Sequence, residues 1–176
     1  MRRVRRVLVT GVSGVGKSTT VRELARRGLK AVDLDDPAWS EWVDSPDGDG
    51  PSPLHPGQDW LWRADRVGRL LATQDADVLV VGGCAPNLGA FRDRFDVIVL
   101  LSAPAVVMAS RLGDRDGSAY GTHPEELARS LRFKETVEPR LRSIAHAEID
   151  TTAPLDDVVG TLLALARTAG KPTLAR

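Results

Sequence analysis

Short apolar runs alternate along this chain with longer segments in which apolar residues recur every three or four positions. The short runs predict strands, and the periodic segments predict helices. We expect four strands and a weaker fifth, at residues 4–10, 30–34, 77–81, 97–101 and 147–150. The fourth run, VIVLL, is continuously apolar, which is typical of a strand that is covered on both faces.

Segments with a helical pattern lie between and after these strands, at residues 17–27, 58–72, 123–142 and 152–167. The first ends in two arginines followed by Gly28, which is a common signal for the end of a helix. The last begins with Thr152 as the expected cap, followed by Pro154 and an acidic first turn. Strands that alternate with helices predict an α/β fold with a parallel sheet.

One stretch departs from this alternation. Residues 44–57, DSPDGDGPSPLHPG, are rich in proline, glycine and aspartate, which predicts irregular backbone. We expect a mobile loop here, at about residues 37–58. The chain as a whole, residues 1–176, has the length of one domain and shows no internal repeat.

Charge and composition narrow the classes of partner. The 24 basic and 24 acidic residues balance to a net charge of zero, which argues against nucleic acid or a membrane surface as a partner. No apolar run approaches the length of a membrane span, and the run after the N-terminal arginines is too short for a signal peptide. The single cysteine, Cys84, suits a reducing compartment, so we expect a cytoplasmic protein.

A glycine-rich loop carries the strongest chemical signal. GVSGVGKS, residues 11–18, matches the pattern G-x-x-x-x-G-K-[ST] in full, directly after a predicted strand and before a predicted helix. Its glycines allow backbone N–H groups to face phosphate oxygens, Lys17 would reach the β- and γ-phosphates, and the Ser18 hydroxyl would hold Mg²⁺. We expect ATP to be bound by Gly11, Ser13, Gly14, Val15, Gly16, Lys17, Ser18 and Thr19.

The position of the remaining carboxylates separates the classes of nucleotide-binding protein. Neither the third nor the fourth predicted strand ends in the acid that motor ATPases use, and no guanine-reading Asn-Lys-x-Asp motif is present. Asp33 and Asp35 instead follow the second strand, in VDLDD, where both would project to one face at the ligand-binding edge. They could hold a hydrated Mg²⁺ and orient an acceptor hydroxyl, or they could form an acidic turn with Asp36 and Pro37.

On these residues the chain resembles the small P-loop kinases of metabolites, a group that holds shikimate kinase, gluconate kinase and the nucleoside monophosphate kinases. GVSGVGKST is similar to the gluconate kinase loop, and the D-x-D of Asp33 and Asp35 is similar to the shikimate kinase motif. The resemblance implies a three-layer fold: a five-stranded parallel sheet with helices on both faces and a small lid at about residues 111–123. It also implies that Asp33 serves the metal and that Asp35 is the catalytic base on the acceptor side.

The same resemblance suggests further acceptor-side residues. Arg63, in WLWRADR, stands where these kinases place an arginine that binds the acceptor's anionic group, although it could equally be a solvated helix residue. Gly82 and Gly83 match two of the three glycines that lie against the substrate in shikimate kinases. The third position is Cys84, which departs from that pattern.

Two arginines fit the lid of these kinases. Arg111 and Arg115, in RLGDR, have the R-x-x-x-R spacing of a lid in which one arginine stacks on adenine and another meets the phosphates. Arg111 would therefore bind the nucleotide, and Arg115 would be catalytic. The alternative is that both are ordinary cations in the last turn of a helix.

The aromatic residues are distributed unevenly. All four tryptophans lie between the second strand and the second helix, the region that covers the acceptor in these kinases; they are Trp39, Trp42, Trp60 and Trp62. They could form a flat wall for a ring-shaped acceptor, or the loop could use them to pack its own apolar cluster. Both interpretations remain open from the sequence.

Two functions remain on these observations. The first is an ATP- and Mg²⁺-dependent kinase that transfers the γ-phosphoryl group to a hydroxyl or phosphate of a small metabolite, ring-shaped if the tryptophans line its site. The second is an ATP-binding regulatory or partner protein with little kinase activity. In either case we expect a monomer or homodimer that engages a small molecule rather than nucleic acid or a membrane.

Overall fold

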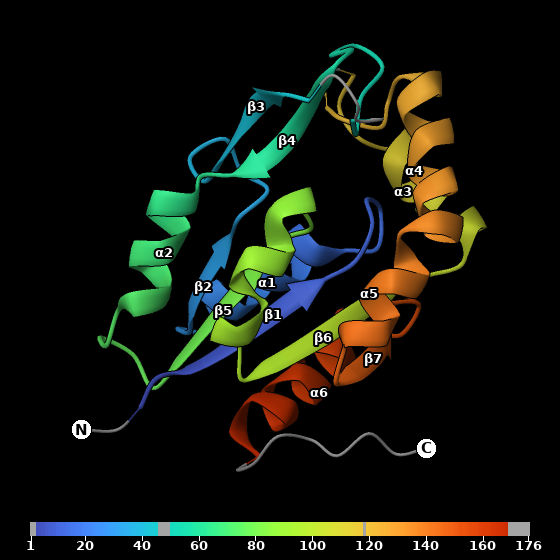
Figure 1. The fold of residues 1–176 in the computed structure, drawn as a ribbon. Coiled ribbons are helices and arrows are strands. Elements are labelled where there is room, and N and C mark those ends of the chain that lie inside the picture. Colours follow the sequence, from blue (N-terminus) through green and yellow to red (C-terminus); the bar gives the residue numbers. More distant parts are fainter. Residues whose placement is uncertain (1–2, 46–49, 118, 169–176) are drawn as a thin grey trace.

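A five-stranded parallel sheet forms the centre of the protein in a computed structural model that describes residues 3–45, 50–117 and 119–168 (Figure 1). The order of the strands across the sheet is β2, β5, β1, β6, β7. All neighbouring pairs are parallel, so the carboxyl ends of the strands meet at one edge. The five predicted strands are confirmed, with bounds β1 Arg5–Thr10, β2 Lys30–Asp33, β5 Val78–Gly82, β6 Val97–Ser102 and β7 Ala147–Asp150.

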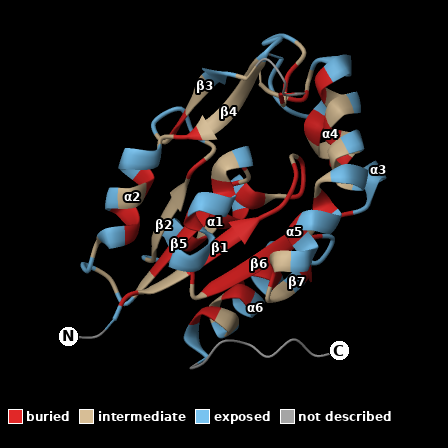
Figure 2. Cartoon of the chain, in the orientation of Figure 1, coloured by how far each residue is buried: buried red, intermediate tan, exposed pale blue. Residues whose placement is uncertain are grey.

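Helices cover both faces of this sheet and make a three-layer α/β fold, as expected. One apolar cluster packs Leu8 of β1 against side chains of α2 (Ala64–Ala72), η1 (Pro86–Arg94) and α5 (Glu138–Ile144). A second cluster packs the alternate residues of β1 against α1 (Lys17–Arg26), α3 (Ala105–Gly113) and α6 (Leu155–Arg167). Because both faces are covered, β6 and most of β1 are buried, as Figure 2 shows.

A two-stranded antiparallel hairpin replaces part of a predicted helix and part of the predicted loop. The hairpin pairs β3 (Ser40–Asp44) with β4 (Gln58–Trp62) and lies beyond the carboxyl end of β2 (Figure 1). The prediction of a helix over 58–72 was therefore wrong at its start, because α2 begins only at Ala64. Aromatic side chains favour extended backbone when they pair across strands, and Trp42 lies opposite Trp60 here.

The predicted helix over 123–142 is two helices, α4 (Pro124–Thr136) and α5. Pro139 stands in the first turn of α5, where its missing N–H costs no helical hydrogen bond, and this position breaks the longer helix. The helices η1 and α3 were not predicted. Thr152 does not cap α6: Pro154 occupies the cap position, and the Thr152 hydroxyl donates to Asp150.

The end of α1 agrees with its sequence signal, since Gly28 follows the cap residue with a φ of 84°. None of the described helices is long and apolar enough to cross a membrane.

Candidate active site

The glycine-rich loop joins β1 to α1 at the carboxyl edge of the sheet. Gly14 and Gly16 have φ angles of 87° and 99°, a backbone conformation that glycine adopts without strain. Gly16 is the cap residue of α1, and no described side chain caps that helix. The N-terminus of α1 therefore offers N–H groups and a partial positive charge to an anion, as a phosphate cradle requires.

Lys17 connects this loop to the acidic residues after β2. Its side chain is only 8% exposed, and Nζ donates to the carbonyl oxygens of Gly11 at 2.7 Å and Val12 at 3.2 Å. The same Nζ lies 3.6 Å from Oδ2 of Asp35. Lys17 therefore places one positive charge between the loop and the acid, where negative charge from a phosphate would be offset. Ser18 follows in the first turn of α1 and is exposed.

Asp35 is held by its surroundings rather than free in solvent. Its Oδ1 accepts a hydrogen bond from the backbone N–H of Cys84 at 3.0 Å, which leaves Oδ2 on the side of Lys17. Burial raises the pKa of Asp35, and the positive charge of Lys17 opposes that rise. A carboxylate with a raised pKa beside a cation and a phosphate loop is a candidate for proton transfer.

Asp33 shows features of both interpretations weighed from the sequence. Its Oδ1 accepts a hydrogen bond from the backbone N–H of Asp35 at 3.1 Å, which forms an Asx turn, as the acidic-turn interpretation predicts. The carboxylate also lies close enough to Asp35 to raise that residue's pKa. Asp33 therefore shapes the turn and adds negative charge to the same site.

Gly82, the last residue of β5, and Gly83 after it allow this close packing. A Cβ at Gly82 would lie 2.5 Å from Cγ2 of Val21 in α1. A Cβ at Gly83 would lie 3.0 Å from both Oδ1 of Asp35 and Cζ2 of Trp62. At the third position of this motif, Cys84 contributes its backbone N–H to Asp35, and burial raises the pKa of its thiol.

The tryptophans divide between two tasks. Trp60 donates its indole N–H to the backbone carbonyl of Asp35 at 3.1 Å. Trp62 is buried against Phe91, and Trp39 packs on the same apolar cluster. Trp42 instead stacks on His55, with ring centroids 4.0 Å apart and an interplanar angle of 16°. Trp60 thus supports the backbone at Asp35, while Trp39 and Trp62 pack the apolar core.

Arg63 occupies the cap position of α2, as expected for an arginine at the start of that helix. Its Nη1 lies 2.5 Å from Oε2 of Glu41 on β3, so its charge is paired across the hairpin. The sequence did not indicate this partner, because the hairpin that brings Glu41 to Arg63 was not predicted.

Arg111 lies against the phosphate loop. From the last turn of α3 it donates to the carbonyl oxygen of Val15 at 3.4 Å and to the hydroxyl of Thr151 at 2.9 Å. Thr151, in the turn after β7, donates in turn to the carbonyl of Val15 at 2.7 Å. Sequence reasoning missed Thr151, because a lone threonine after a weak strand belongs to no motif.

The lid predicted at about residues 111–123 overlaps the end of α3 and the connection from α3 to α4, and we use the name lid for residues 114–117 and 119–123 of that connection. Arg115 is exposed and donates to the backbone carbonyl of Tyr120 at 2.8 Å. The Tyr120 hydroxyl donates to the carbonyl of Pro51 at 2.8 Å. Burial raises the pKa of Tyr120, and hydrogen bonds with Ser130 and with Ser13 of the phosphate loop partly oppose that rise. Tyr120 therefore lies where the lid, the phosphate loop and the hairpin connection meet, the last being residues 50–57, which lead into β4.

A buried carboxylate fastens the hairpin connection to the lid. Glu126 of α4 is 6% exposed and accepts from the hydroxyl of Ser52 and from the N–H of Gly121, the latter at 2.8 Å. Arg129, one turn further along α4, donates to the carbonyl of Gly50 at 2.5 Å. We call these interactions the loop–lid contact. No sequence pattern indicated it, since a glutamate in the first turn of a helix is ordinarily solvated.

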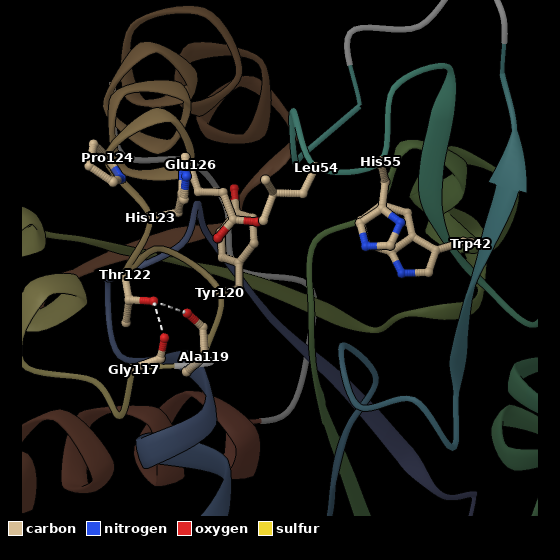
Figure 3. Close-up of a pocket in the computed structure, with 10 residues that line it drawn as sticks. All are labelled: Trp42, Leu54, His55, Gly117, Ala119, Tyr120, Thr122, His123, Pro124 and Glu126. Atoms are coloured by element: carbon tan, nitrogen blue, oxygen red, sulfur yellow. Dashed lines mark hydrogen bonds between the residues drawn. The ribbon is translucent and has the colours of Figure 1, made fainter.

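A pocket of about 550 Å³ lies between the hairpin and the lid (Figure 3). The stacked rings of Trp42 and His55 form one side. Tyr120 and Glu126 lie on the opposite side, with Leu54 between them and the stack. Among the described residues, no group of three or more His, Cys, Asp or Glu side chains is placed to hold a metal ion.

A family profile described as an AAA domain matches residues 7–132, which is more than half of the chain. The chain belongs to the AAA domain family. The match covers the phosphate loop, Asp35 and Arg111 of this AAA domain protein. No curated protein sequence matches it.

Solved structures show that the fold of this AAA domain protein is shared with several kinases. It is similar to shikimate kinase from Acinetobacter baumannii in complex with shikimate, at 20% identity and a TM-score of 0.62 over 93% of each chain. It is also similar to a gluconokinase from Sinorhizobium meliloti, at 23% identity and a TM-score of 0.54 over 92% of this chain and 91% of that one. Deoxyadenosine kinase from M. mycoides with bound dATP aligns at 12% identity and a TM-score of 0.53 over 93% of this chain and 100% of that one.

Proposed function

We propose that this protein transfers the γ-phosphoryl group of ATP to a hydroxyl of a small molecule. The placement of Asp35 carries the proposal: one carboxylate oxygen is held by the Cys84 N–H, and the other faces the phosphate-loop lysine 3.6 Å away. A base that removes a proton from an acceptor hydroxyl has to lie beside the transferred phosphoryl group, and Lys17 marks that position.

The phosphate loop and its neighbours would position the triphosphate. The N–H groups at the start of α1 would face the phosphate oxygens, and Lys17 would exchange its bonds to loop carbonyls for bonds to phosphate. Arg111, braced by Thr151, would stand at the nucleotide, with Arg115 as the lid cation near the phosphates. These side chains work through position and charge, which is what phosphoryl transfer requires of a protein.

Mg²⁺ suits the donors present. Ser18 and Asp33 would supply a hydroxyl and a carboxylate, and a magnesium site usually completes its six oxygens with water and phosphate rather than with further protein ligands. When bound, Mg²⁺ offsets the charge that builds up on the transferring oxygens.

Acceptor-dependent ADP release by wild type, Asp35→Asn and Asp36→Asn proteins tests the proposal. Asp36 is exposed and one residue away, so its variant makes the same charge change without touching the site. Loss of a general base lowers turnover by roughly 10²- to 10⁴-fold, so we expect that loss for Asp35→Asn and near-normal turnover for Asp36→Asn.

Full turnover by Asp35→Asn would remove Asp35 from the mechanism. If ATP binds but no acceptor raises turnover, and ATP instead changes the oligomeric state or partner binding, then the protein is an ATP-binding regulatory protein. Arg63, Gly82 and Gly83 are proposed to lie on the acceptor side, with Gly83 giving the room that Asp35 occupies.

A further inference from the structure

We propose that the acceptor of this kinase is not an anion but a neutral or amine-bearing hydroxyl compound. The inference rests on the proposed function and concerns the chemical class of its substrate. Three observations support it: the pairing of Arg63, the charge of the hairpin segment, and the lining of the pocket between the hairpin and the lid.

The first observation is that the cation best placed to bind an anionic acceptor is already paired. Arg63 and Glu41 face each other across the hairpin, with Nη1 and Oε2 2.5 Å apart. An incoming phosphate or carboxylate that bonded to this guanidinium would share it with Glu41 and would face that carboxylate at close range. Like charges at such distances repel, so the Glu41 carboxylate weakens the binding of any anion to Arg63.

The second observation is the charge of the acceptor-side segment. The described parts of this segment, residues 33–45 and 50–63, contain six acidic residues and one basic residue, Arg63. Arg66 and Arg129 donate to its backbone from neighbouring helices, which leaves an excess of acidic side chains. The whole chain is neutral, so this segment is a local concentration of negative charge rather than a reflection of overall composition. A field of this sign lowers the local concentration of anions and raises that of cations.

The third observation is the lining of the pocket. Among the residues that the structure describes, none that lines it is lysine or arginine. The acid that lines the pocket, Glu126, accepts hydrogen bonds from Ser52 and Gly121. Its negative charge disfavours an anion in the pocket. The stacked Trp42 and His55 rings suit a flat, apolar or cationic face of a ligand.

Three polyhydroxylated six-membered carbocycles that differ in charge provide the probes: inositol, which is neutral; inosamine, which carries one amine; and shikimate, which carries a carboxylate. Binding of each to the full chain is measured by saturation-transfer NMR, with a non-hydrolysable ATP analogue filling the nucleotide site. We expect inositol and inosamine to bind at least about tenfold more tightly than shikimate, the scale that local fields impose on charged ligands.

A charge variant identifies the cause. Glu41→Gln releases Arg63 and is expected to tighten shikimate binding by about tenfold. Asp44→Asn removes one charge from the same hairpin without freeing Arg63, because Asp44 bonds to Gln58, and it is expected to change shikimate binding much less. Both residues lie on the hairpin at least partly exposed, and thermal unfolding verifies that both variants fold.

The outcomes separate the two proposals. Equal or tighter binding of shikimate by the wild type, absence of binding by all three probes, or identical effects of the two variants would overturn the inference. Preferential binding of the neutral and amine probes supports it, whether or not they are phosphorylated. If they bind but neither these nor a wider panel of non-anionic hydroxyl compounds yields a phosphoester, the charge preference stands and the proposed phosphoryl transfer fails.

Discussion

Replacement of Gly83 by alanine tests whether this glycine exists to let Asp35 take its position. The new Cβ would lie 3.0 Å from Oδ1 of Asp35, 3.0 Å from Cζ2 of Trp62 and 3.1 Å from Nε1 of Trp62. Carbon atoms pack best at about 3.5–4.0 Å, so each neighbour has to move by a few tenths of an ångström. Extra atoms in a packed region cost about 1–3 kcal/mol of unfolding free energy.

The two neighbours differ in how easily they move. Trp62 is 2% exposed and packs on Phe91, whereas the Asp35 side chain is 28% exposed. We therefore expect Asp35 to move and its hydrogen bond from the Cys84 N–H to lengthen. A displacement of a catalytic group by about 1 Å costs roughly 10²-fold in rate, so we expect a shift of a few tenths of an ångström to lower turnover by less than that.

Urea unfolding and ATP-dependent phosphorylation of an acceptor measure the two effects, with Gly68→Ala as the matched control. Gly68 lies in α2, and a Cβ there would meet no atom within 4 Å beyond the backbone of its own helix. Alanine at this position should therefore stabilise the helix by about 0.5–1 kcal/mol and leave turnover unchanged. If Gly83→Ala is as stable and as active as the wild type, then Gly83 does not make room for Asp35 and our account of the β5 glycines is wrong.

Three further changes probe other parts of the site. Glu126→Ala removes two hydrogen bonds and leaves the Ser52 hydroxyl buried without its acceptor; we expect a loss of about 3 kcal/mol in urea unfolding and faster amide exchange at residues 50–56. Asp35→Asn should stabilise the protein against urea at neutral pH. Burial raises the pKa of Asp35 in the folded state, so the wild type loses stability as pH rises through that pKa. Below about pH 4 the carboxyl is protonated in both the folded and unfolded states, and the advantage of the variant should vanish. Thr151→Val removes the hydroxyl that braces Arg111 and should weaken ATP binding about tenfold by calorimetry, while Thr161→Val, at an exposed position of α6, should not.

Much of the fold follows from the sequence because the strands are buried on both faces. Continuous apolar runs between helical segments are a strong signal, and all five strands of the parallel sheet were predicted within a residue or two. The phosphate loop was equally plain, since its residue types and spacing follow from what a phosphate requires. The carboxyl edge of a parallel sheet then brings Asp35 to Lys17, which the sequence order alone suggests.

The acceptor side could not be predicted in the same way because it depends on contacts between distant residues. Trp60 has a helical spacing to Ala64 and Val67, and only pairing with β3 makes residues 58–62 a strand. That pairing also joins Arg63 to Glu41, which changes what the arginine can bind. A solvated helix would not bury Glu126, so the loop–lid contact is visible only once the hairpin connection packs against α4.

Phosphorus NMR of the protein with ATP, Mg²⁺ and a panel of neutral and amine-bearing hydroxyl compounds is the most direct test of phosphoryl transfer. We expect a phosphomonoester signal to grow in step with ADP for at least one compound with the wild type, and to be lost or greatly slowed with Asp35→Asn. ATP that stays intact, or that yields only inorganic phosphate with every acceptor, would contradict the proposal that this protein is a small-molecule kinase.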